Sequence, residues 1–240
     1  MMKKAFGLVT VFRTLPSRIS RLQELAYNLW WSWHPEARAL YSTLDADLWE
    51  QVIHNPVRLL SKLHPGSTIL YNLILSKSVP ALIERDGGKA IRTRVGHSYI
   101  KAEMRKDNAI FAGEHSGHFY FRDNWFADSG LIAFLLILEL ISIENKPLSE
   151  LIKPLDTWVR SGEINTRVND VAGKVKAIEE HFGKHALSVD HLDGVTIDYG
   201  DWWFNVRPSN TEPLLRLNVE AKTRTLMEQK RDEVVTFIRE

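Results

Sequence analysis

The sequence predicts a protein of mixed α/β plus α+β class that begins with a helical segment. The first 63 residues are helix-like and poor in glycine, and they hold half of the eight tryptophans: Trp30, Trp31, Trp33 and Trp49. From His64, short β-rich runs alternate with helical patterns, as in α/β proteins. After Pro154 a third segment has its own strand and helix pattern and the length of a small domain. We therefore expect three parts: residues 1–63, 64–154 and 155–240.

Hydrophobic periodicity and turn residues predict the elements of the second and third parts. In residues 64–154 we expect strands at Thr68 to Leu73, Ala90 to Val95, Ala109 to Ala112 and His118 to Arg122, and helices at Val79 to Arg85 and Ser98 to Lys106. In residues 155–240 we expect strands at Glu163 to Val168, Val195 to Asp198, Trp202 to Val206 and Leu214 to Val219, and helices at Val171 to His181 and Arg224 to Arg239. These patterns predict a partial α/β/α domain and then a small α+β domain with a mostly antiparallel sheet.

The run from Leu131 to Ile143 is apolar except for Glu139. It is shorter than the ~20 residues that a membrane-spanning helix needs, so it predicts a buried core helix. Asp128-Ser129, just before it, supplies residue types that cap helix N-termini.

Composition excludes several classes of function. The chain is 44% hydrophobic and 25% charged, with a formal net charge of +1, so no long-range field would attract nucleic acid or an anionic membrane. It has no cysteine, which excludes disulfides and thiolate metal sites and is compatible with a reducing cytoplasm. Arg13 interrupts the short apolar run near the start, and no cleavage site follows, so we expect a cytoplasmic protein rather than a secreted one.

The segment Arg207-Pro208-Ser209-Asn210-Thr211-Glu212-Pro213 follows a predicted strand and concentrates phosphate-binding groups in one turn. The planar guanidinium of Arg207 fits two phosphate oxygens. Short neutral donors come from Ser209, Asn210 and Thr211, on a backbone stiffened by two prolines. The segment predicts a phosphosugar site, and it contains no residue that would act as a nucleophile by itself.

A second polar cluster lies in the sequence GEHSGH, from Gly113 to His118. On an extended backbone, Glu114, Ser116 and His118 would point to one side and could orient a sugar ring. A polar turn that joins two strands is an equal alternative on spacing alone. The flanking glycines favour the binding site, because they allow close approach of the backbone to a ligand.

Lys101 is a further candidate, because it would point from the first turns of a helix towards the same cleft. A lysine on a helix is most often a solvated surface residue. His97 is expected to start that helix or to pack, rather than to catalyse. His54-Asn55-Pro56 would be part of a catalytic loop only if a reactive serine preceded it, and Val52-Ile53 stand there instead. We therefore expect the tripeptide to form a helix-ending turn.

We expect no metal site, because the histidines are scattered and neither an Asp-x-Asp triplet nor an HExxH pair occurs. The tryptophan cluster suits either a sugar-stacking platform or, more commonly, a hydrophobic core.

Residues from about 64 to 240 resemble the C-terminal half of bacterial phosphomannomutase/phosphoglucomutase, in the α-D-phosphohexomutase family. The resemblance runs through HPGSTILYNL, GEHSGHFYFRDNWFADSG, SGEINTRV and WWFNVRPSNTEPLLRLNVEA. In that family the third domain supplies sugar selectivity and the fourth binds the substrate phosphate. The resemblance implies that Glu114 and Ser116 bind hexose hydroxyls and that Lys101 and His118 line the cleft. It also implies a phosphate cradle made of Arg207, Ser209, Asn210 and Thr211.

Family members are isomerases of the intramolecular phosphotransferase type, which interconvert hexose 6-phosphate and hexose 1-phosphate. They use an enzyme phosphoserine, Mg²⁺ on an Asp-x-Asp-x-Asp-Arg loop and a hexose 1,6-bisphosphate activator. The phosphoserine loop, with the motif Thr-Ala-Ser-His-Asn-Pro, and the Mg²⁺ loop belong to the first two domains of the family. Neither the serine motif nor the Asp-x-Asp-x-Asp-Arg motif occurs in this sequence. We therefore expect a third domain that is cut at His64, no catalytic serine and no cofactor bound by this chain.

Residues 1 to about 63 resemble the N-terminal segment of bacterial α-glucan (maltodextrin) phosphorylases, through LAYNLWWSWHPEARALYSTLDADLWEQVIHNPVRLL. The chain thus resembles a fusion of parts of two glucan-metabolism proteins. The expected partners are glucose or mannose 1- or 6-phosphate, with glucan as a further candidate, and neither nucleic acid nor membrane. Three hypotheses stay open: a phosphohexomutase half that is inactive alone, a non-catalytic sugar-phosphate or glucan-binding module, and a fusion remnant without function.

Overall fold

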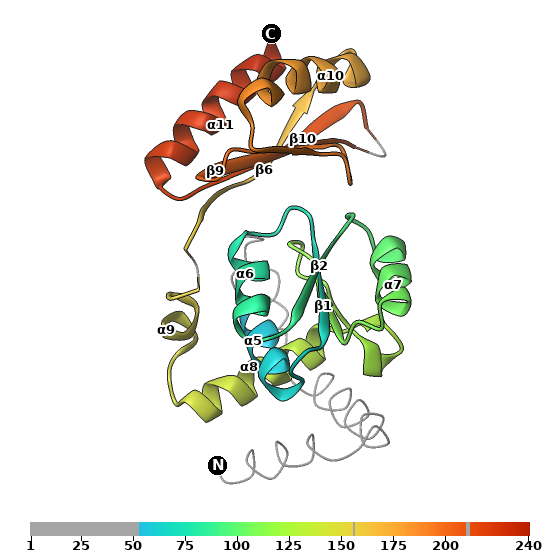
Figure 1. Cartoon of the computed structure of the whole chain (residues 1–240), viewed down its shortest axis with the longest axis vertical. Coiled ribbons are helices and arrows are strands. Elements are labelled where there is room, and N and C mark those ends of the chain that lie inside the picture. Colours follow the sequence, from blue (N-terminus) through green and yellow to red (C-terminus); the bar gives the residue numbers. More distant parts are fainter. Residues whose placement is uncertain (1–52, 156, 210–211) are drawn as a thin grey trace, which may run out of the picture.

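The protein is represented by a computed structural model that describes residues 53–155, 157–209 and 212–240. They form two layered units, one above the other along the long axis of the molecule (Figure 1). We call residues 53–155 the first unit and residues 157–240 the second unit. The tryptophan cluster and most of the expected N-terminal segment lie outside the described residues.

The first unit is built on a mixed five-stranded sheet with the order β2-β1-β3-β4-β5. Strands β2, β1 and β3 are parallel, and β4 and β5 add to them as antiparallel strands. Its elements in chain order are α5 (His54–Leu63), β1 (Thr68–Asn72), α6 (Ser78–Arg85), β2 (Lys89–Thr93), α7 (His97–Lys106), β3 (Phe111–Gly113), β4 (Phe119–Phe121), the 3-10 turn η2 (Arg122–Asn124), β5 (Ala127–Asp128), α8 (Gly130–Glu144) and α9 (Leu148–Ile152). The predicted strands and helices of this part are present, with ends that differ by a few residues.

Two hydrophobic cores cover the two faces of this sheet, which gives the α/β/α layers that the sequence predicts. On one face, α5, α6 and α8 pack against strand residues such as Ile69 and Phe111. On the other face, α7 inserts Ile100 and Met104 against Leu70 and Tyr120.

Helix α5 belongs to the core of the first unit. Its residues Val57 and Leu59 are buried, and so is Ile53 just before it. The prediction that His54-Asn55-Pro56 ends a helix was wrong, because α5 begins at His54. Proline is tolerated in the first turn of a helix, where the backbone N–H groups have no intrahelical acceptor.

The apolar run forms α8, which Ser129 caps by accepting a hydrogen bond from the backbone N–H of Ile132 at 3.3 Å. The prediction of a buried core helix is confirmed for one side of α8 only. One side, including Ala133 and Leu140, packs into the core, whereas Phe134, Leu138 and Ile143 are 53%, 42% and 56% exposed. The apolar pattern alone could not separate these two sides, because both are equally hydrophobic.

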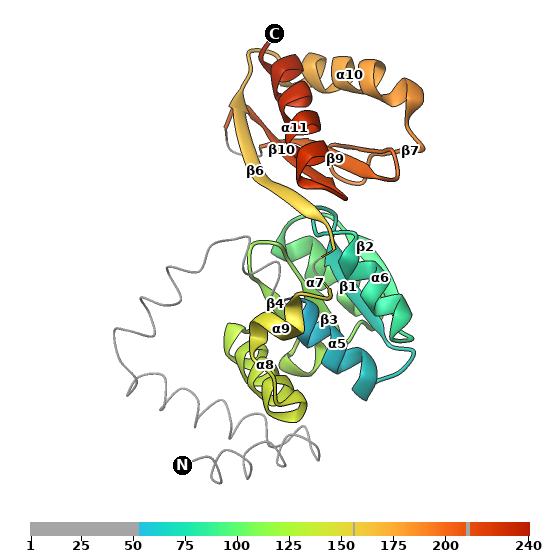
Figure 2. The same ribbon diagram turned by 90° about the vertical axis from the view of Figure 1, so that its left-hand side faces the viewer.

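The second unit is an antiparallel sheet with the order β6-β10-β9-β8-β7. Its elements are β6 (Val159–Arg167), α10 (Val171–Phe182), the 3-10 turn η3 (Gly183–His185), β7 (Ser188–Asp190), β8 (Val195–Asp198), β9 (Trp202–Pro208), β10 (Leu214–Ala221) and α11 (Arg224–Arg239). Helices α10 and α11 cover one face, where Phe204, Val206 and Leu217 form the core. Among the described residues no helix covers the other face, which is turned towards the first unit, as Figures 1 and 2 both show.

No helix within the described ranges is both long enough and apolar enough to cross a membrane.

Candidate functional site

The polar cluster Gly113 to His118 forms the turn between β3 and β4. Its ends are joined by a hydrogen bond from Glu114 N to His118 O at 2.9 Å, and Gly117 N donates to Glu114 O at 3.1 Å. The backbone is therefore the polar turn between two strands that the sequence offered as an equal alternative, and it is not extended. Glu114 and His118 meet because they face each other across a tight turn, and Ser116 lies exposed at its tip.

The two glycines of this turn have structural roles. Gly117 has a φ of 82°, a conformation that other residues rarely adopt. Gly113 faces Ile53: a Cβ atom built on it would lie 1.9 Å from Ile53 Cδ1. The close approach that Gly113 allows is therefore to the side chain before α5.

Glu114 is held by two donors in a buried position, where it is 2% exposed. The Tyr120 hydroxyl donates to Oε2 at 2.7 Å, and the backbone N–H of Gly96 donates to Oε1 at 3.2 Å. The same hydroxyl lies 2.7 Å from Nδ1 of His97. Burial and the neighbouring Glu114 raise the pKa of Tyr120 well above its ordinary value, so the hydroxyl stays a proton donor.

Two histidines flank Glu114. His97 is the first residue of α7, as the sequence predicts for a helix-start histidine. Its ring centroid lies 4.4 Å from that of His118, with an interplanar angle of 64°. Nδ1 of His118 lies 2.7 Å from Oδ2 of Asp128, whose other oxygen accepts from Phe119 N at 2.8 Å. Both rings are thus held through Nδ1.

Lys101 lies one helical turn after His97 on α7, so the two share a side of the helix. Among the described residues, no hydrogen bond or ion pair to its ammonium group is observed. The expected direction of the Lys101 side chain towards the turn that carries Glu114 therefore stays a prediction.

A second polar surface lies on the helix-free face of the second sheet. Side chains alternate between the faces of a strand, so this face displays every second residue of each central strand. It comprises Trp203, Asn205 and Arg207 on β9 and Arg216, Asn218 and Glu220 on β10, and we call these six residues the polar face.

Arg207 lies on this face within β9, rather than in the turn that follows. Its Nη2 is paired with Oε2 of Glu163 at 2.7 Å, and Arg216 Nη1 is paired with the other oxygen of Glu163 at 2.8 Å. One carboxylate therefore holds two guanidinium groups side by side. Glu163 is a residue that the sequence analysis missed as a site residue, because its partners lie on other strands.

Several buried atoms of the polar face have no hydrogen-bonding partner among the residues that the structure describes. They are Asn205 Oδ1, Arg207 Nε, Arg216 Nε and Asn218 Oδ1. Buried polar groups are normally paired, so such a concentration on one surface points to a polar ligand or ordered water.

The remaining predicted phosphate-binding residues are only partly visible. Ser209 is half-buried, and its backbone N–H donates to Leu214 O at 2.9 Å, which begins the turn back into β10. Asn210 and Thr211 lie outside the described residues.

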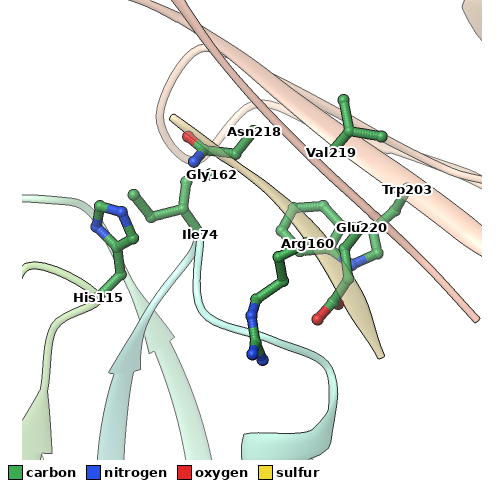
Figure 3. A pocket seen from close by; sticks show the side chains of 8 residues that line it. All are labelled: Ile74, His115, Arg160, Gly162, Trp203, Asn218, Val219 and Glu220. Atoms are coloured by element: carbon green, nitrogen blue, oxygen red, sulfur yellow. The ribbon is translucent and has the colours of Figure 1, made fainter. Parts of the chain in front are cut away.

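The polar face and the first unit meet in a small pocket (Figure 3). The lining residues from the first unit are Ile74 and His115, and those from the second are Arg160, Gly162, Trp203, Asn218, Val219 and Glu220. The turn that carries Glu114 and His118 therefore faces the polar face through its middle residue, His115.

Glu220 anchors this junction. Its Oε2 accepts from Trp203 Nε1 at 2.6 Å and from the backbone N–H of Lys77 at 3.0 Å. Burial raises the pKa of the Glu220 carboxyl above its ordinary value, although these donors act in the opposite direction.

Charged pairs surround the junction, with cations on the first unit and carboxylates on the second. Lys77 Nζ lies 2.6 Å from Asp198, and Arg92 pairs with Asp190. Asp193 accepts from the backbone N–H of Val95 at 3.3 Å.

Known proteins share this arrangement. Residues 52–157 match the family model for phosphoglucomutase/phosphomannomutase, alpha/beta/alpha domain III, and residues 163–237 match the model for the C-terminal domain of the same enzymes. The two units therefore have the phosphohexomutase domain III and domain IV fold, as the sequence resemblance predicts.

Two curated relatives give the extent of the similarity. A phosphomannomutase of Methanocaldococcus jannaschii is 48% identical over 173 residues, which are 72% of this chain and 38% of that protein. The phosphomannomutase of Escherichia coli strain K12 is 39% identical over 179 residues, which are 74% of this chain and 39% of that protein. The matched part of the chain thus spans about two fifths of the length of these relatives.

Solved structures of related proteins have the same fold as the two units. The crystal structure of a phosphoglucomutase/phosphomannomutase family protein from Burkholderia thailandensis superposes with a TM-score of 0.67 at 28% identity, over 79% of this chain and 41% of that one. The Aspergillus fumigatus N-acetylphosphoglucosamine mutase, solved with GlcNAc-6P and magnesium, has a TM-score of 0.58 at 11% identity, over 82% of this chain and 47% of that one, and shows the fold alone.

The beginning of the chain matches a different family. Residues 15–71 match a model described as a protein of unknown function (DUF3417). That description names no activity, so the resemblance to α-glucan phosphorylases stays a prediction. The match overlaps the domain III match over α5 and β1.

Proposed function

We propose that the two units bind hexose phosphates, such as glucose or mannose 1- or 6-phosphate, as the sugar-binding and phosphate-binding half of a phosphohexomutase, an isomerase of the intramolecular phosphotransferase type. One observation carries the proposal. The polar face, with Arg207 and Arg216 paired on Glu163, lies opposite the turn that holds Glu114 and His118. A ligand with hydroxyls at one end and a dianion at the other fits such a pair of surfaces.

The sugar would bind at the turn. Glu114 would accept from adjacent hydroxyls, and Ser116 on the turn and Lys101 on α7 would add further polar contacts to the sugar. The two donors that hold Glu114 fix its position before a sugar arrives, which lowers the ordering cost of binding.

The phosphate would bind beside Arg207, together with Ser209, Asn210 and Thr211. In the unliganded protein Arg207 has a carboxylate partner, Glu163. A phosphate therefore competes with Glu163 for this guanidinium or uses its Nε side, which has no partner among the described residues. Bidentate arginine–phosphate pairing makes that exchange favourable.

The described residues do not fit the Mg²⁺ that related enzymes use. Magnesium prefers oxygen ligands in an octahedral arrangement, and the Asp-x-Asp-x-Asp-Arg motif does not occur in the sequence. Phosphoryl transfer also needs a phosphate acceptor or donor group, and we assign none to this chain. Transfer by this half is therefore expected only when the complementary domains are supplied.

We also propose the expected division into domain III-like and domain IV-like parts, with α5 added to the first. The buried Ile53 and Val57 support this extension.

Calorimetric titration tests the binding function. Glucose 1-phosphate and mannose 1-phosphate should bind, whereas glucose alone should bind much more weakly. The Arg207→Ala variant should lose affinity, and Arg224→Ala, whose side chain is 74% exposed on the far side of the sheet, should keep it. Equal affinity of both variants and the wild type would contradict the phosphate assignment.

A mixing experiment separates catalysis from binding. The N-terminal portion of the Methanocaldococcus jannaschii phosphomannomutase, up to the start of the matched part, would be added with Mg²⁺ and glucose 1,6-bisphosphate. Restored interconversion of hexose 1-phosphate and hexose 6-phosphate supports a role of this chain in phosphoryl transfer. Phosphosugar binding without turnover favours a non-catalytic sugar-phosphate module, and absence of both overturns the proposal.

A further inference from the structure

The first unit brings together a group of side chains that sequence spacing did not indicate as a metal site. His97, Glu114 and His118 offer ligand atoms that all lie within 4.8 Å of one another. They come from the start of α7 and from the two ends of the β3–β4 turn, so the parallel sheet and the turn together create the group.

The hydrogen bonds leave both imidazoles in a form that suits a metal. The Tyr120 hydroxyl donates to Glu114, so His97 Nδ1–H donates to the hydroxyl oxygen, at 2.7 Å. In the same way His118 Nδ1–H donates to Asp128, also at 2.7 Å. Each Nε2 then carries a lone pair. Metal-bound histidines characteristically donate their other N–H to a carboxylate or a similar acceptor, as these two do.

The carboxylate of Glu114 completes the group. It is buried, and each of its oxygens accepts one hydrogen bond, so each keeps a further lone pair. A divalent cation bound between this carboxylate and the two imidazoles would compensate the charge of the carboxylate. The group therefore offers three lone-pair donors to a cation, two imidazole nitrogens and one carboxylate oxygen, and the carboxylate supplies a compensating charge.

We propose that Nε2 of His97, Nε2 of His118 and a carboxylate oxygen of Glu114 form a binding site for Zn²⁺. Two histidines and one carboxylate form a common three-residue zinc set, which leaves the fourth tetrahedral position open to water or to an oxygen of a ligand. Nitrogen ligands favour zinc over magnesium and calcium.

The geometry needs only a small adjustment. Ligands at about 2.0–2.1 Å from a tetrahedral ion lie about 3.3 Å from one another. One ring nitrogen of each histidine and one carboxylate oxygen of Glu114 lie at most 4.8 Å from one another, and side-chain rotation would bring the three ligands to the shorter spacing. His97 is exposed, so its ring can move without disturbing the core.

The zinc site shares Glu114 and His118 with the proposed sugar site. Its test requires no sugar, so failure of zinc binding can be told from failure of the proposed sugar-phosphate function. The purified full chain would be titrated with ZnCl₂ by calorimetry, and with CoCl₂ while visible absorption is recorded. One Zn²⁺ per chain should bind with a dissociation constant in the micromolar range or below, and Co²⁺ should give the absorption bands of a tetrahedral site.

Four variants make the test specific. The His97→Ala and His118→Ala variants should each weaken zinc binding by roughly 100-fold or more. Asp128→Asn keeps all three ligands but disturbs the orientation of His118, and a loss of about 10–100-fold is expected. His191→Ala is the matched control, because His191 pairs with Glu179 in the second unit, and the variant should keep the zinc affinity of the wild type.

The proposal is overturned if zinc binds the His97→Ala and His118→Ala variants as tightly as the wild type, or if no binding occurs below about 100 μM. Circular dichroism of each variant distinguishes loss of a ligand from loss of fold. Because His97 is exposed, His97→Ala is expected to keep the native spectrum.

Discussion

The hydroxyl of Tyr120 donates a hydrogen bond to Glu114 at 2.7 Å, and both residues are buried between the sheet and α7. Strand β4 thus supplies the group that holds the carboxylate of the adjoining turn. The sequence contains both residues in the string that carries the family resemblance, but it does not show that one positions the other.

Removing this hydroxyl should weaken both the fold and the site. Tyr120→Phe keeps the ring and leaves Oε2 of Glu114 without its side-chain donor, so we expect a loss of about 1–3 kcal/mol in the free energy of unfolding. Phosphosugar affinity should fall as well. Urea denaturation and calorimetry measure the two effects. Tyr99→Phe, at a side chain that is 46% exposed, is the control and should change neither.

Gly113→Ala should overpack the contact with Ile53. The added Cβ would lie 1.9 Å from Ile53 Cδ1, so neighbouring groups must move, and a destabilisation of about 1–3 kcal/mol is expected. Ile53→Ala alone leaves a cavity and should cost about 2–5 kcal/mol.

The double variant Gly113→Ala/Ile53→Ala should be more stable than the sum of the single effects predicts, because the new methyl group fills part of the cavity. Thermal unfolding of the two single variants and of the double variant measures the three changes in stability. Strict additivity would show that the two residues are not in contact.

Arg207→Ala should weaken hexose-phosphate binding by ~1.5–3 kcal/mol, the usual loss for a charged hydrogen-bonding partner. Glu163→Gln should act in the opposite direction, because it removes the carboxylate that competes with phosphate for Arg207 and Arg216. Calorimetry with glucose 1-phosphate measures both. An unchanged affinity in Arg207→Ala would remove this residue from the site.

Glu220 should give stability a pH dependence of known sign. Its pKa is raised in the folded protein, so the folded state holds the proton more tightly than the unfolded state. The stabilising contribution of Glu220 to the free energy of unfolding is fully present below the ordinary pKa of a glutamate. This contribution is lost as the pH rises through the raised pKa of the folded state.

Glu220→Gln should remove this dependence, because the amide stays neutral and its oxygen still accepts from Trp203. Urea denaturation at several pH values, compared between the variant and the wild type, isolates the effect. Parallel profiles for the two proteins would contradict it.

Deleting residues 1–63 should lower solubility and stability. The deletion removes α5 and the buried residues Ile53, Val57 and Leu59, so apolar surface of the first unit would be exposed. A deletion of residues 1–52 keeps α5 and is the matched comparison. Expression yield and thermal unfolding measure the difference, and a well-behaved 64–240 fragment would refute the prediction.

The strands and helices of both units were predictable because their hydrophobic patterns are regular. The strand Val195–Asp198 and the helix Arg224–Arg239 have the predicted ends. The strand Ser188–Asp190 was not predicted, since it is short, lies at the sheet edge and has little buried surface. Edge strands depend on their neighbour more than on a pattern of their own.

The candidate site was predictable in its residues but only partly in its geometry. Glu114 and His118 were selected as a pair, although the backbone between them is a turn. His97 joins them because β2, β1 and β3 are parallel, so the start of α7, which follows β2, lies at the same edge of the sheet as the end of β3. Glu163 likewise reaches Arg207 across β10. Such contacts depend on strand order, which a single sequence does not contain.

The chain passes between the two units once, and charged pairs such as Lys77 with Asp198 lie across the junction. Partly exposed pairs of this kind each contribute about 0–1 kcal/mol and weaken as salt is added. These pairs therefore contribute only several small, salt-dependent amounts to holding the two units together. A molecule that reached from Glu114 to Arg207 would contact both units, so its binding energy would add to the stability of the junction.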